Sequence, residues 1–420
     1  MVQKIEPISG FPEYTPAQQL AFGRIVATIQ GVYSRFGYTP LETPAVERID
    51  TLVSKGIDSK EVYALRRLNV QGDDDGAKEL ALRFDLTVPT ARYVAQHYPT
   101  LVFPFRRQQT QPVWRGERPK AGRYRQFYQC DIDYIADGEL PLAADAEIIA
   151  CAFTALKELG LRFTMRVNNR TVLHDMLSAC GFAADTHTAA IAVIDDMEKR
   201  PRDAIAADLA ALGGDATGLL NMLANAAALP ATQGVTDARR VLSLIERMIG
   251  AEAMASVVFD PTIARGLNYY TGTVVETVLH EAPELGSICS GGRYENLAEG
   301  LSGRHLPGVG ISIGLSRLAS WMMAQNGPFA PAAASPAQVF VAHADGFDAA
   351  PVVAALRARG VAVEQSFDAL PVAKQLMNAD KRGLRYGIVG VDGPLVQLRV
   401  FATRTTEALT LDAVIARVRA

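Results

Sequence analysis

The feature that most constrains the fold is a change of character in the middle of the chain. Residues from about 173 to 255 are rich in Ala and Leu, poor in aromatic residues, and spaced as helices are. The segments on both sides contain short apolar stretches that alternate as strands do. With 420 residues, the chain is long enough for two or three domains with separate cores. We therefore expect a mixed core that is interrupted by a helical module.

The first clear element is a helix over residues 15–37. Thr15 can cap it, Pro16 suits the first helical position, and Gln18 stands where a capping box needs it. Gly37 ends the pattern. The apolar residues at helical spacing are Phe22, Ile25, Val26, Ile29, Val32, Tyr33 and Phe36.

Further elements follow from local patterns. The segment LALRFDLTVPTARYVA predicts a strand that runs into a helix, and GVGISIGLSRLASWMM predicts the same order. FYQCDIDYIA predicts a strand with Gln129, Asp131 and Asp133 on one face. The Pro- and Ala-rich residues 326–336 suit a linker, and strand and helix patterns alternate beyond it, as in a small α/β domain.

Composition excludes several classes of protein. The net charge is only −3, so a polyanion would have to be met by a local patch. The N-terminus lacks a signal-peptide pattern and no stretch of 18 apolar residues occurs. We therefore expect a cytoplasmic protein that is neither secreted nor inserted into a membrane. The four cysteines and six histidines are scattered, which favours reduced thiols and no protein-held metal site.

One local patch fits a polyanion. Residues 105–126 carry seven Arg or Lys and one Glu, interleaved with aromatic residues such as Trp114 and Tyr124. A solvated charged face is the ordinary explanation, but flat rings beside guanidinium groups suit a base and its phosphates. The sequence contains no phosphate loop, dinucleotide-binding glycine pattern or nucleophile elbow. Chemistry at a phosphate would therefore need side-chain cations, and the candidates are Arg115, Arg123, Arg265 and Arg317.

Six segments carry a family resemblance. WRGERPKAGRYRQFYQCDID and GVGISIGLSRL resemble the second and third signatures of class II aminoacyl-tRNA synthetases. ARGLNYYTG and CSGGRYENL resemble the histidine-binding signatures of the histidyl-tRNA synthetase family. RFDLTVPTARY, together with KQLMNADKRG, resembles the eukaryotic-like variant found in some bacteria. The likeness spans nearly the whole chain and is weak only in 173–255.

The resemblance implies an α+β fold in which a class II antiparallel-sheet catalytic core is split by a helical insertion. The implied parts are a first catalytic segment (1–172), the insertion (173–255), a second catalytic segment (256–325), a linker (326–336) and an α/β anticodon-binding domain (337–420). It also implies a homodimer formed through the helix at residue 15 and the following YTPLETPAVER.

The implied activity is formation of histidyl-adenylate and pyrophosphate from histidine and ATP, followed by transfer of histidine to the 3′ end of tRNA(His). Asp85, Thr87 and Gln129 would bind the ammonium group of histidine. The imidazole would meet Asp133 and Tyr270, near Tyr269, with Tyr294 lining the pocket. A carboxylate beside a phenol suits a polar ring with two nitrogens.

For ATP, the resemblance implies that Arg115 and Arg265 hold the α-phosphate from opposite sides and that Arg317 holds the γ-phosphate. Glu117 would lie at the adenine, Phe127 would stack on it, and Arg123 would join the site, with Mg²⁺ bound alongside. Arg118 and Lys120 would meet the acceptor end of the tRNA. Each residue alone also fits a structural role, because single arginines usually form ion pairs and paired tyrosines usually lie in cores.

Three residues depart from the family pattern. Asn268 stands where the family usually has Asp, and Ser316 replaces a common acidic residue. Lys120 occupies a position where many bacterial members have Gln, which leaves open whether the extra 5′ guanosine of tRNA(His) is required.

Two alternatives remain. A non-catalytic paralogue, the regulatory subunit of ATP phosphoribosyltransferase, shares the core but lacks the C-terminal domain. It also loses the arginines of the second class II signature and of the RGL-YY segment. A synthetase for proline, threonine or glycine would not explain ARGLNYYTG beside CSGGRYENL. In the C-terminal domain, the candidate phosphate contacts are Lys374, Lys381, Arg382 and Arg385, although a solvated helix face explains them equally well.

Overall fold

The computed structural model describes residues 6–53, 61–66, 80–120, 122–197, 199–225, 229, 231–264, 270–295 and 303–419. The chain divides into two compact units. The first contains the residues up to Pro12 and Val26–Ser320, and the second contains Glu13–Ile25 and the residues from Trp321 onward. Each unit is built around a β-sheet of its own.

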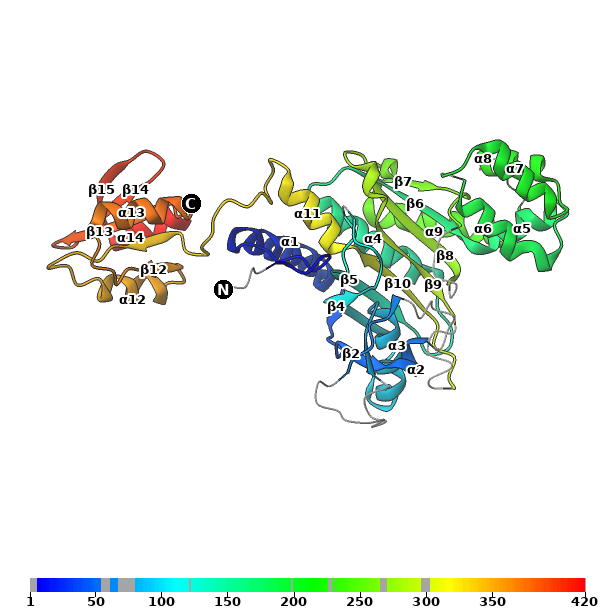
Figure 1. Cartoon of the computed structure of the whole chain (residues 1–420), viewed down its shortest axis with the longest axis horizontal. Coiled ribbons are helices and arrows are strands. Elements are labelled where there is room, and N and C mark those ends of the chain that lie inside the picture. The colour runs from blue at the N-terminus through cyan, green and yellow to red at the C-terminus, as the bar shows by residue number, and fades with distance from the viewer. Residues whose placement is uncertain are drawn as a thin grey trace. The chain divides into compact units, whose positions relative to one another are not determined.

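The first unit contains an eight-stranded sheet in the order β1-β4-β5-β10-β9-β8-β6-β7 (Figure 1). Its central pairs are antiparallel, and only the outermost pairs, β1 with β4 and β6 with β7, are parallel. The predicted antiparallel sheet is thereby confirmed. The strands, in sheet order, are Thr39–Pro40, Phe105–Trp114, Gln126–Ile135, Gly308–Ile313, Ser287–Tyr294, Tyr270–Leu279, Phe163–Asn169 and Val257–Phe259.

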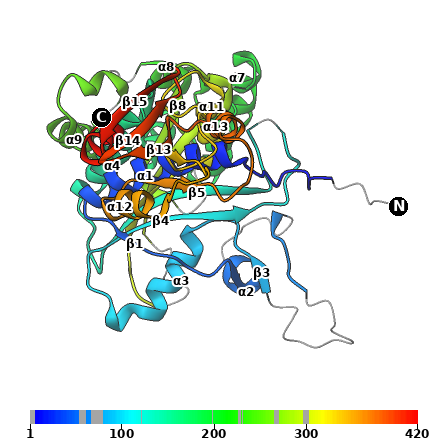
Figure 2. The same cartoon turned by 90° about the vertical axis from the view of Figure 1, so that its left-hand side faces the viewer.

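Long β4 and β5 run side by side (Figure 2), and their register places Arg107 opposite Asp133 and Gln109 opposite Asp131. On the other side of β5, Gly310 of β10 is opposite Asp133. Successive side chains of a strand alternate between the faces of the sheet. Residues 129, 131 and 133 therefore share one face, as the sequence predicts.

Helices cover this sheet. α4 (Leu142–Glu158) packs against β10, β9 and β5, and its small buried alanines let the helix approach the strands closely. α9 (Gln233–Ile249) packs on α4 and β6 and also on α5, and its Val241 and Ile245 are buried. This helix, which lies within the predicted insertion (173–255), therefore contacts both the helices over the sheet and the rest of the insertion.

The other helices between β6 and β7 share a core, to which Val235 of α9 and Ala264 also belong. Most of its members come from α5 (Arg170–Ala179), α6 (His187–Asp195), α7 (Arg202–Ala211) and α8 (Ala216–Ala224). Asn169 caps α5 and Asp215 caps α8, since each side chain accepts a backbone N–H of the first turn. These helices gather into one group in Figure 1.

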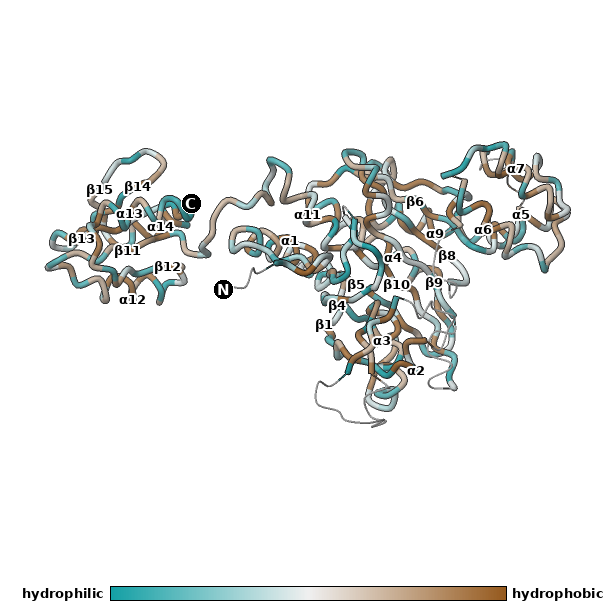
Figure 3. The backbone as a smooth tube through the Cα atoms, viewed as in Figure 1, coloured by the Kyte–Doolittle hydropathy of each residue, from teal (hydrophilic) through white to brown (hydrophobic). Residues whose placement is uncertain are grey.

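The predicted helix at residue 15 is α1 (Pro16–Arg35), which alternates between hydrophobic and hydrophilic residues (Figure 3). The predicted capping box is present, because Gln18 Oε1 accepts from Thr15 N at 2.9 Å. A small sheet pairs β2 (Val46–Arg48) with β3 (Leu80–Leu82), near α2 (Ile49–Val53). The chain then enters α3 (Thr87–His97).

The second unit contains a five-stranded sheet in the order β12-β11-β13-β14-β15. Its first three strands are parallel and the last two are antiparallel. The strands, in sheet order, are Val363–Gln365, Val339–Val341, Tyr386–Asp392, Leu395–Val400 and Thr405–Thr410. The helices are α12 (Ala350–Ala358), α13 (Val372–Lys381) and α14 (Leu411–Arg419). Strand and helix alternate here as the sequence predicts.

α11 (Leu315–Ala324) follows β10 directly, and the residues between α11 and β11 form no helix or strand. All four cysteines lie among the described residues, where they are buried and unpaired. In the same part of the chain, no helix is both long and apolar enough to cross a bilayer.

Candidate functional site

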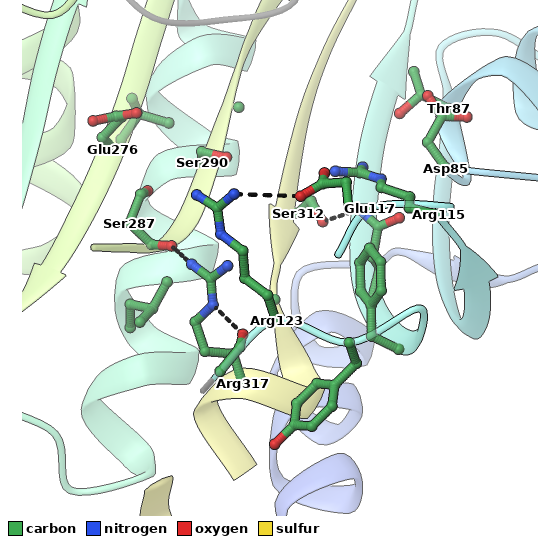
Figure 4. Close-up of a pocket in the computed structure, with 18 of the residues that line it drawn as sticks. Asp85, Thr87, Arg115, Glu117, Arg123, Glu276, Ser287, Ser290, Ser312 and Arg317 are labelled. Atoms are coloured by element: carbon green, nitrogen blue, oxygen red, sulfur yellow. Dashed lines mark hydrogen bonds and ion pairs between the residues drawn. The ribbon is translucent and has the colours of Figure 1, made fainter. Parts of the chain in front are cut away.

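A cavity of about 400 Å³ opens on the large sheet. It collects side chains from the segment after β3, from β5 and the loop before it, and from β8, β9, β10 and α11. Figure 4 shows Arg123 and Arg317 side by side, with Arg115 lying toward Asp85 and Thr87. Nine residues singled out from the sequence line it: Asp85, Thr87, Arg115, Glu117, Arg123, Phe127, Gln129, Tyr270 and Arg317.

Among the described residues, three guanidinium groups, those of Arg115, Arg123 and Arg317, line the cavity. Arg317 donates from Nε to Gly122 O at 2.9 Å and from Nη1 to Leu285 O at 2.9 Å, so carbonyl oxygens fix its direction. Figure 4 shows its further contact with Ser287 O, at 3.2 Å. Burial lowers the pKa of Arg317, and the positive charges of Arg123 and Arg115 lower it further, against the opposing effect of Glu117. Like charges held this close favour an anionic ligand.

Arg115 is held over an aromatic ring. Its Nε donates to Phe84 O at 3.1 Å, and its guanidinium carbon lies 5.2 Å from the centroid of the Phe127 ring. Arg123 instead forms an ion pair with Glu117 at 3.3 Å. This part of the cavity thus combines a flat ring with cations, which suits a base that carries phosphates.

Another part of the cavity is acidic. Asp85 is buried, and its Oδ1 accepts from Val88 N at 3.1 Å in the first turn of α3. Its Oδ2 has no hydrogen-bond partner among the described residues. Burial raises the pKa of Asp85 to about 6, although the Val88 N–H and the charge of Arg115 oppose this rise. A cation that met Oδ2 would relieve the cost of burying this carboxylate.

Gln129 lies beside this acidic part. Its Nε2 donates to Ser312 Oγ at 2.8 Å, which orients the amide (Figure 4). Its Oε1 is buried and unpartnered within the described structure. This oxygen is therefore a ready acceptor for a ligand N–H group.

A smaller adjoining cavity is lined by Asp131, Asp133, Tyr270 and Tyr294. Tyr294 donates from Oη to Asp133 Oδ1 at 2.9 Å, and Arg107 Nη2 lies 2.5 Å from Asp133 Oδ2. Burial raises the pKa of Asp133, while Arg107 and Tyr294 oppose the rise. Burial and the neighbouring Asp133 also raise the pKa of Tyr294 well above its usual value. These contacts join Asp133 and Tyr294, two of the residues predicted for the histidine pocket, into one buried polar cluster.

Glycines make room for this cluster. A Cβ atom on Gly310 would lie 2.2 Å from Asp133 Oδ1, and one on Gly308 would lie 2.5 Å from Tyr294 Oη. No real side chain tolerates such approaches without displacement of its neighbours. The glycines of the GVG segment therefore hold the acidic pocket open.

The resemblance implies that this pocket binds the histidine ring, so Gly310→Ala is expected to displace the Asp133 carboxylate and to raise the KM for histidine in ATP–pyrophosphate exchange. The expected rise is about tenfold, since overpacking costs about 1–3 kcal/mol. The matched control is Gly390→Ala on β13, where an added Cβ has no neighbour within 4 Å. Equal histidine KM values for the two variants would contradict the role assigned to Gly310.

Ser316 has a clear structural partner. Its Oγ accepts from Tyr128 N at 2.8 Å and so ties the start of α11 to β5. The Ser316 hydroxyl accepts the hydrogen bond that the backbone N–H of Tyr128 donates, and it places no negative charge beside Arg317.

The other predicted residues differ in their positions. Arg118 and Lys120 are exposed and line neither cavity. Arg265, Asn268 and Tyr269 lie outside the described residues. The residues of these cavities or their immediate surroundings that sequence reasoning did not assign to the site include Arg107, Asp131, Glu276 and Ser312. Strand parity already placed Asp131 beside Asp133, whereas Arg107 is linked to them only through the register of β4 with β5.

Among the described residues, no group of three or more His, Cys, Asp and Glu side chains could hold a metal ion. The larger cavity nevertheless offers the carboxylate of Glu276, besides Asp85 and Glu117, which are predicted to meet histidine and adenine. Mg²⁺ commonly uses one or two protein carboxylates together with phosphates and water. The residues present therefore fit a magnesium ion that arrives with a nucleotide.

Known proteins resemble this chain over most of its length. Residues 10–318 match the family model described as "Histidyl-tRNA synthetase". The histidine–tRNA ligase of Thermobifida fusca is 40% identical over 405 residues, which cover 90% of both chains. A histidyl-tRNA synthetase crystal structure from Nostoc sp. PCC 7120 superposes with a TM-score of 0.87 at 31% identity, covering 99% of both chains.

A third match has a double title, ATP phosphoribosyltransferase regulatory subunit/histidyl-tRNA synthetase, from Bacillus halodurans. Its TM-score is 0.74 at 23% identity, over 90% of this chain and 97% of that one, which establishes a shared fold alone. The extent of the family match and the identity to the Thermobifida enzyme decide the relationship: this chain belongs to the histidyl-tRNA synthetase family.

Proposed function

We propose that this protein activates histidine with ATP to form histidyl-adenylate and pyrophosphate, and then transfers histidine to the 3′ end of tRNA(His). The observation that carries this proposal is one cavity whose described lining includes three guanidinium groups together with Asp85 and Gln129. Asp85 and Gln129 each have a buried oxygen without a hydrogen-bond partner among the described residues. Such a cavity can bind a nucleoside triphosphate and an amino acid together.

Histidine would bind through its ammonium group to Asp85 Oδ2, with Gln129 Oε1 and Thr87 nearby. Its ring would lie between Asp133 and Tyr270, beside Tyr294, with Tyr269 close by. Support comes from the buried atoms that lack partners and from the order of these residues around the two cavities.

ATP would place its adenine against Phe127 and Glu117 and its phosphates toward Arg115, Arg123 and Arg317. The histidine carboxylate then attacks the α-phosphorus, and the bond to the bridging oxygen breaks as pyrophosphate leaves. The carboxylate is ionised at neutral pH, so the step needs no protein base. Arg115 would stabilise the charge that develops at the α-phosphate, with Arg265 acting from the opposite side as the family resemblance implies. Mg²⁺ bound to the phosphates would neutralise part of their charge.

For tRNA, the exposed Arg118 and Lys120 would meet the acceptor end. In the second unit, Lys374, Lys381 and Arg385 are exposed candidates for phosphate contacts. Arg382 is less suited, because it pairs with Glu364 at 2.8 Å and lies 5.9 Å from the Phe340 ring centroid. A homodimer formed through the α1 region and a cytoplasmic location complete the proposal, and small-angle scattering at monomer mass would contradict the dimer.

The regulatory-subunit alternative is not favoured. That type of paralogue loses the arginines of the ATP site and the C-terminal domain, whereas this chain has Arg115, Arg123 and Arg317 in one cavity and a second unit with its own sheet.

The test is ATP–pyrophosphate exchange with each of the twenty amino acids in the absence of tRNA, followed by charging of tRNA(His). Exchange with histidine alone is expected. Exchange with no amino acid would overturn the synthetase proposal, and exchange with a different one would overturn the assignment of the acidic pocket to histidine.

A further inference from the structure

The acidic pocket contains a carboxyl group that the proposed function does not use. Asp131 is 2% exposed and lies on β5 between Gln129 and Asp133, on the same face of the sheet. It lines the smaller cavity together with Asp133, Tyr270 and Tyr294. Its Oδ1 is buried and has no hydrogen-bond partner among the described residues.

Asp133 is better satisfied than Asp131. Its Oδ1 accepts from Tyr294, and its Oδ2 is 2.5 Å from Arg107 Nη2. The same Nη2 is 3.8 Å from Asp131 Oδ2, so one guanidinium group serves two carboxylates unequally. A buried carboxylate oxygen with no donor carries a large desolvation cost. Asp131 Oδ1 is thus placed to interact with a ligand in the cavity.

The charges of the pocket do not balance. Among the described residues, three carboxyl groups, Asp85, Asp131 and Asp133, face two guanidinium groups, Arg107 and Arg115. Bound histidine adds one ammonium group and one carboxylate. With a neutral ring, four carboxylates, two guanidinium groups and one ammonium group keep one uncompensated negative charge. Buried groups in this situation take up a proton.

We propose that Asp131 is a specificity-determining residue of the histidine pocket, which shares one proton between its Oδ1 and a nitrogen of the bound imidazole. The inference rests on the proposed function. Asp133 accepts from the N–H on one side of the ring, and the Asp131 carboxyl group engages the nitrogen on the other side. The pocket then recognises a ring that donates at one nitrogen and accepts at the other, a combination that few side chains offer.

The groups that face Asp131 support a proton at this position. Burial raises the pKa of Asp131 to about 7, while the charge of Arg107 and a hydrogen bond with Ser312 oppose the rise, and Asp133 and Asp85 add to it. Arg83, Tyr33, Cys130 and Cys289 also lie within electrostatic range. Arg83 directs its N–H groups to Thr43 O and Pro112 O and lines neither cavity, so it does not supply the missing charge.

The sign of the pH dependence follows. Above pH 7 the free pocket has released the proton of Asp131, so histidine binding must take one up, and affinity falls about tenfold for each further pH unit. Below about pH 6 free histidine is itself protonated and Asp85 holds a proton, so affinity falls again. Histidine affinity is therefore highest between these limits.

Titration calorimetry of histidine alone, at pH 8 in two buffers of different ionisation enthalpy, tests the proposal directly. The wild-type protein is expected to take up about one proton per histidine, and Asp131→Asn is expected to take up none. The amide keeps a donor and an acceptor at this position but cannot titrate. Asp203→Asn, an exposed site on α7, is the matched control and should behave as wild type.

Exchange kinetics provide a second readout. Asp131→Ala is expected to raise the KM for histidine roughly tenfold to a hundredfold at pH 7 and to leave the KM for ATP unchanged, whereas Asp131→Asn recovers most of the loss. The KM for histidine should rise from pH 7 to 8.5 in wild type and remain flat in Asp131→Asn. An unchanged ATP KM shows that each variant is folded.

Three outcomes would overturn the inference: histidine binding without proton uptake at pH 8, coincident pH profiles of wild type and Asp131→Asn, or an equal rise of both KM values in Asp131→Ala. Failure of the proposed function has a different signature, because histidine would then produce neither binding heat nor exchange.

Discussion

Arg115→Ala is expected to lower kcat for histidine-dependent ATP–pyrophosphate exchange by about 10²–10³-fold, with a much smaller effect on the KM for histidine. The loss is large because a preorganised cation at the site where charge develops stabilises the transition state more than the ground state. In this protein the preorganisation is visible: Phe84 O accepts from Arg115 Nε at 3.1 Å, and the Phe127 ring lies beneath the guanidinium group.

The control for this variant is Arg162→Ala. Arg162 is 74% exposed in its ion pair with Glu281, so its truncation is expected to leave exchange unchanged. Pre-steady-state measurement of adenylate formation would separate the chemical step from product release. A variant with normal kcat and raised KM for ATP alone would show that Arg115 contributes ground-state binding only, and would remove it from the catalytic group.

Arg107→Met is expected to lower the free energy of unfolding by about 3–5 kcal/mol at pH 8, because removal of one partner leaves buried carboxylates without their cation. Arg107 is fully buried against Asp133 and Asp131, and methionine fills much of the same space. In the variant both carboxyl groups take up protons in the folded state. The folded state then binds more protons than the unfolded state, so the stability of the variant falls as pH rises.

Urea denaturation at pH 6 and pH 8 measures this effect, which should be smaller at the lower pH. Addition of Asp131→Asn to Arg107→Met should recover part of the loss, because the two residues are coupled. Arg162→Met provides the surface control, with an expected change within about 0.5 kcal/mol. An Arg107→Met protein that is as stable as wild type at both pH values would show that this guanidinium group does not compensate the carboxylates.

The order of elements was predictable from local patterns. The capping box of Thr15 and Gln18 marks the start of α1, and the alternation in FYQCDIDYIA marks β5. The packing of α9 on α4 was not predictable, because helical periodicity shows that a helix has an apolar face and not which surface covers that face.

The site residues divide in the same way, into those that local sequence patterns identified and those that only the structure showed. The signature segments identified residues that now line one cavity, from Asp85 to Arg317. Ser316 could be recognised only as a departure, and the structure gives it a partner, Tyr128 N. The strand pattern placed Asp131 on the same face as Asp133. Nothing in the sequence showed that Asp131 is a buried carboxylate with an unpartnered oxygen rather than a solvated one.

The sequence by itself determined the family, the elements and the residue types of the site, because these depend on neighbours along the chain. Only the tertiary structure decided that Arg107 lies between Asp131 and Asp133, that Gly310 leaves space for a carboxylate, and that Asp131 Oδ1 has no donor. Those features depend on the register between strands that are distant in sequence. A shift of one residue would turn each of these side chains to the other face of the sheet.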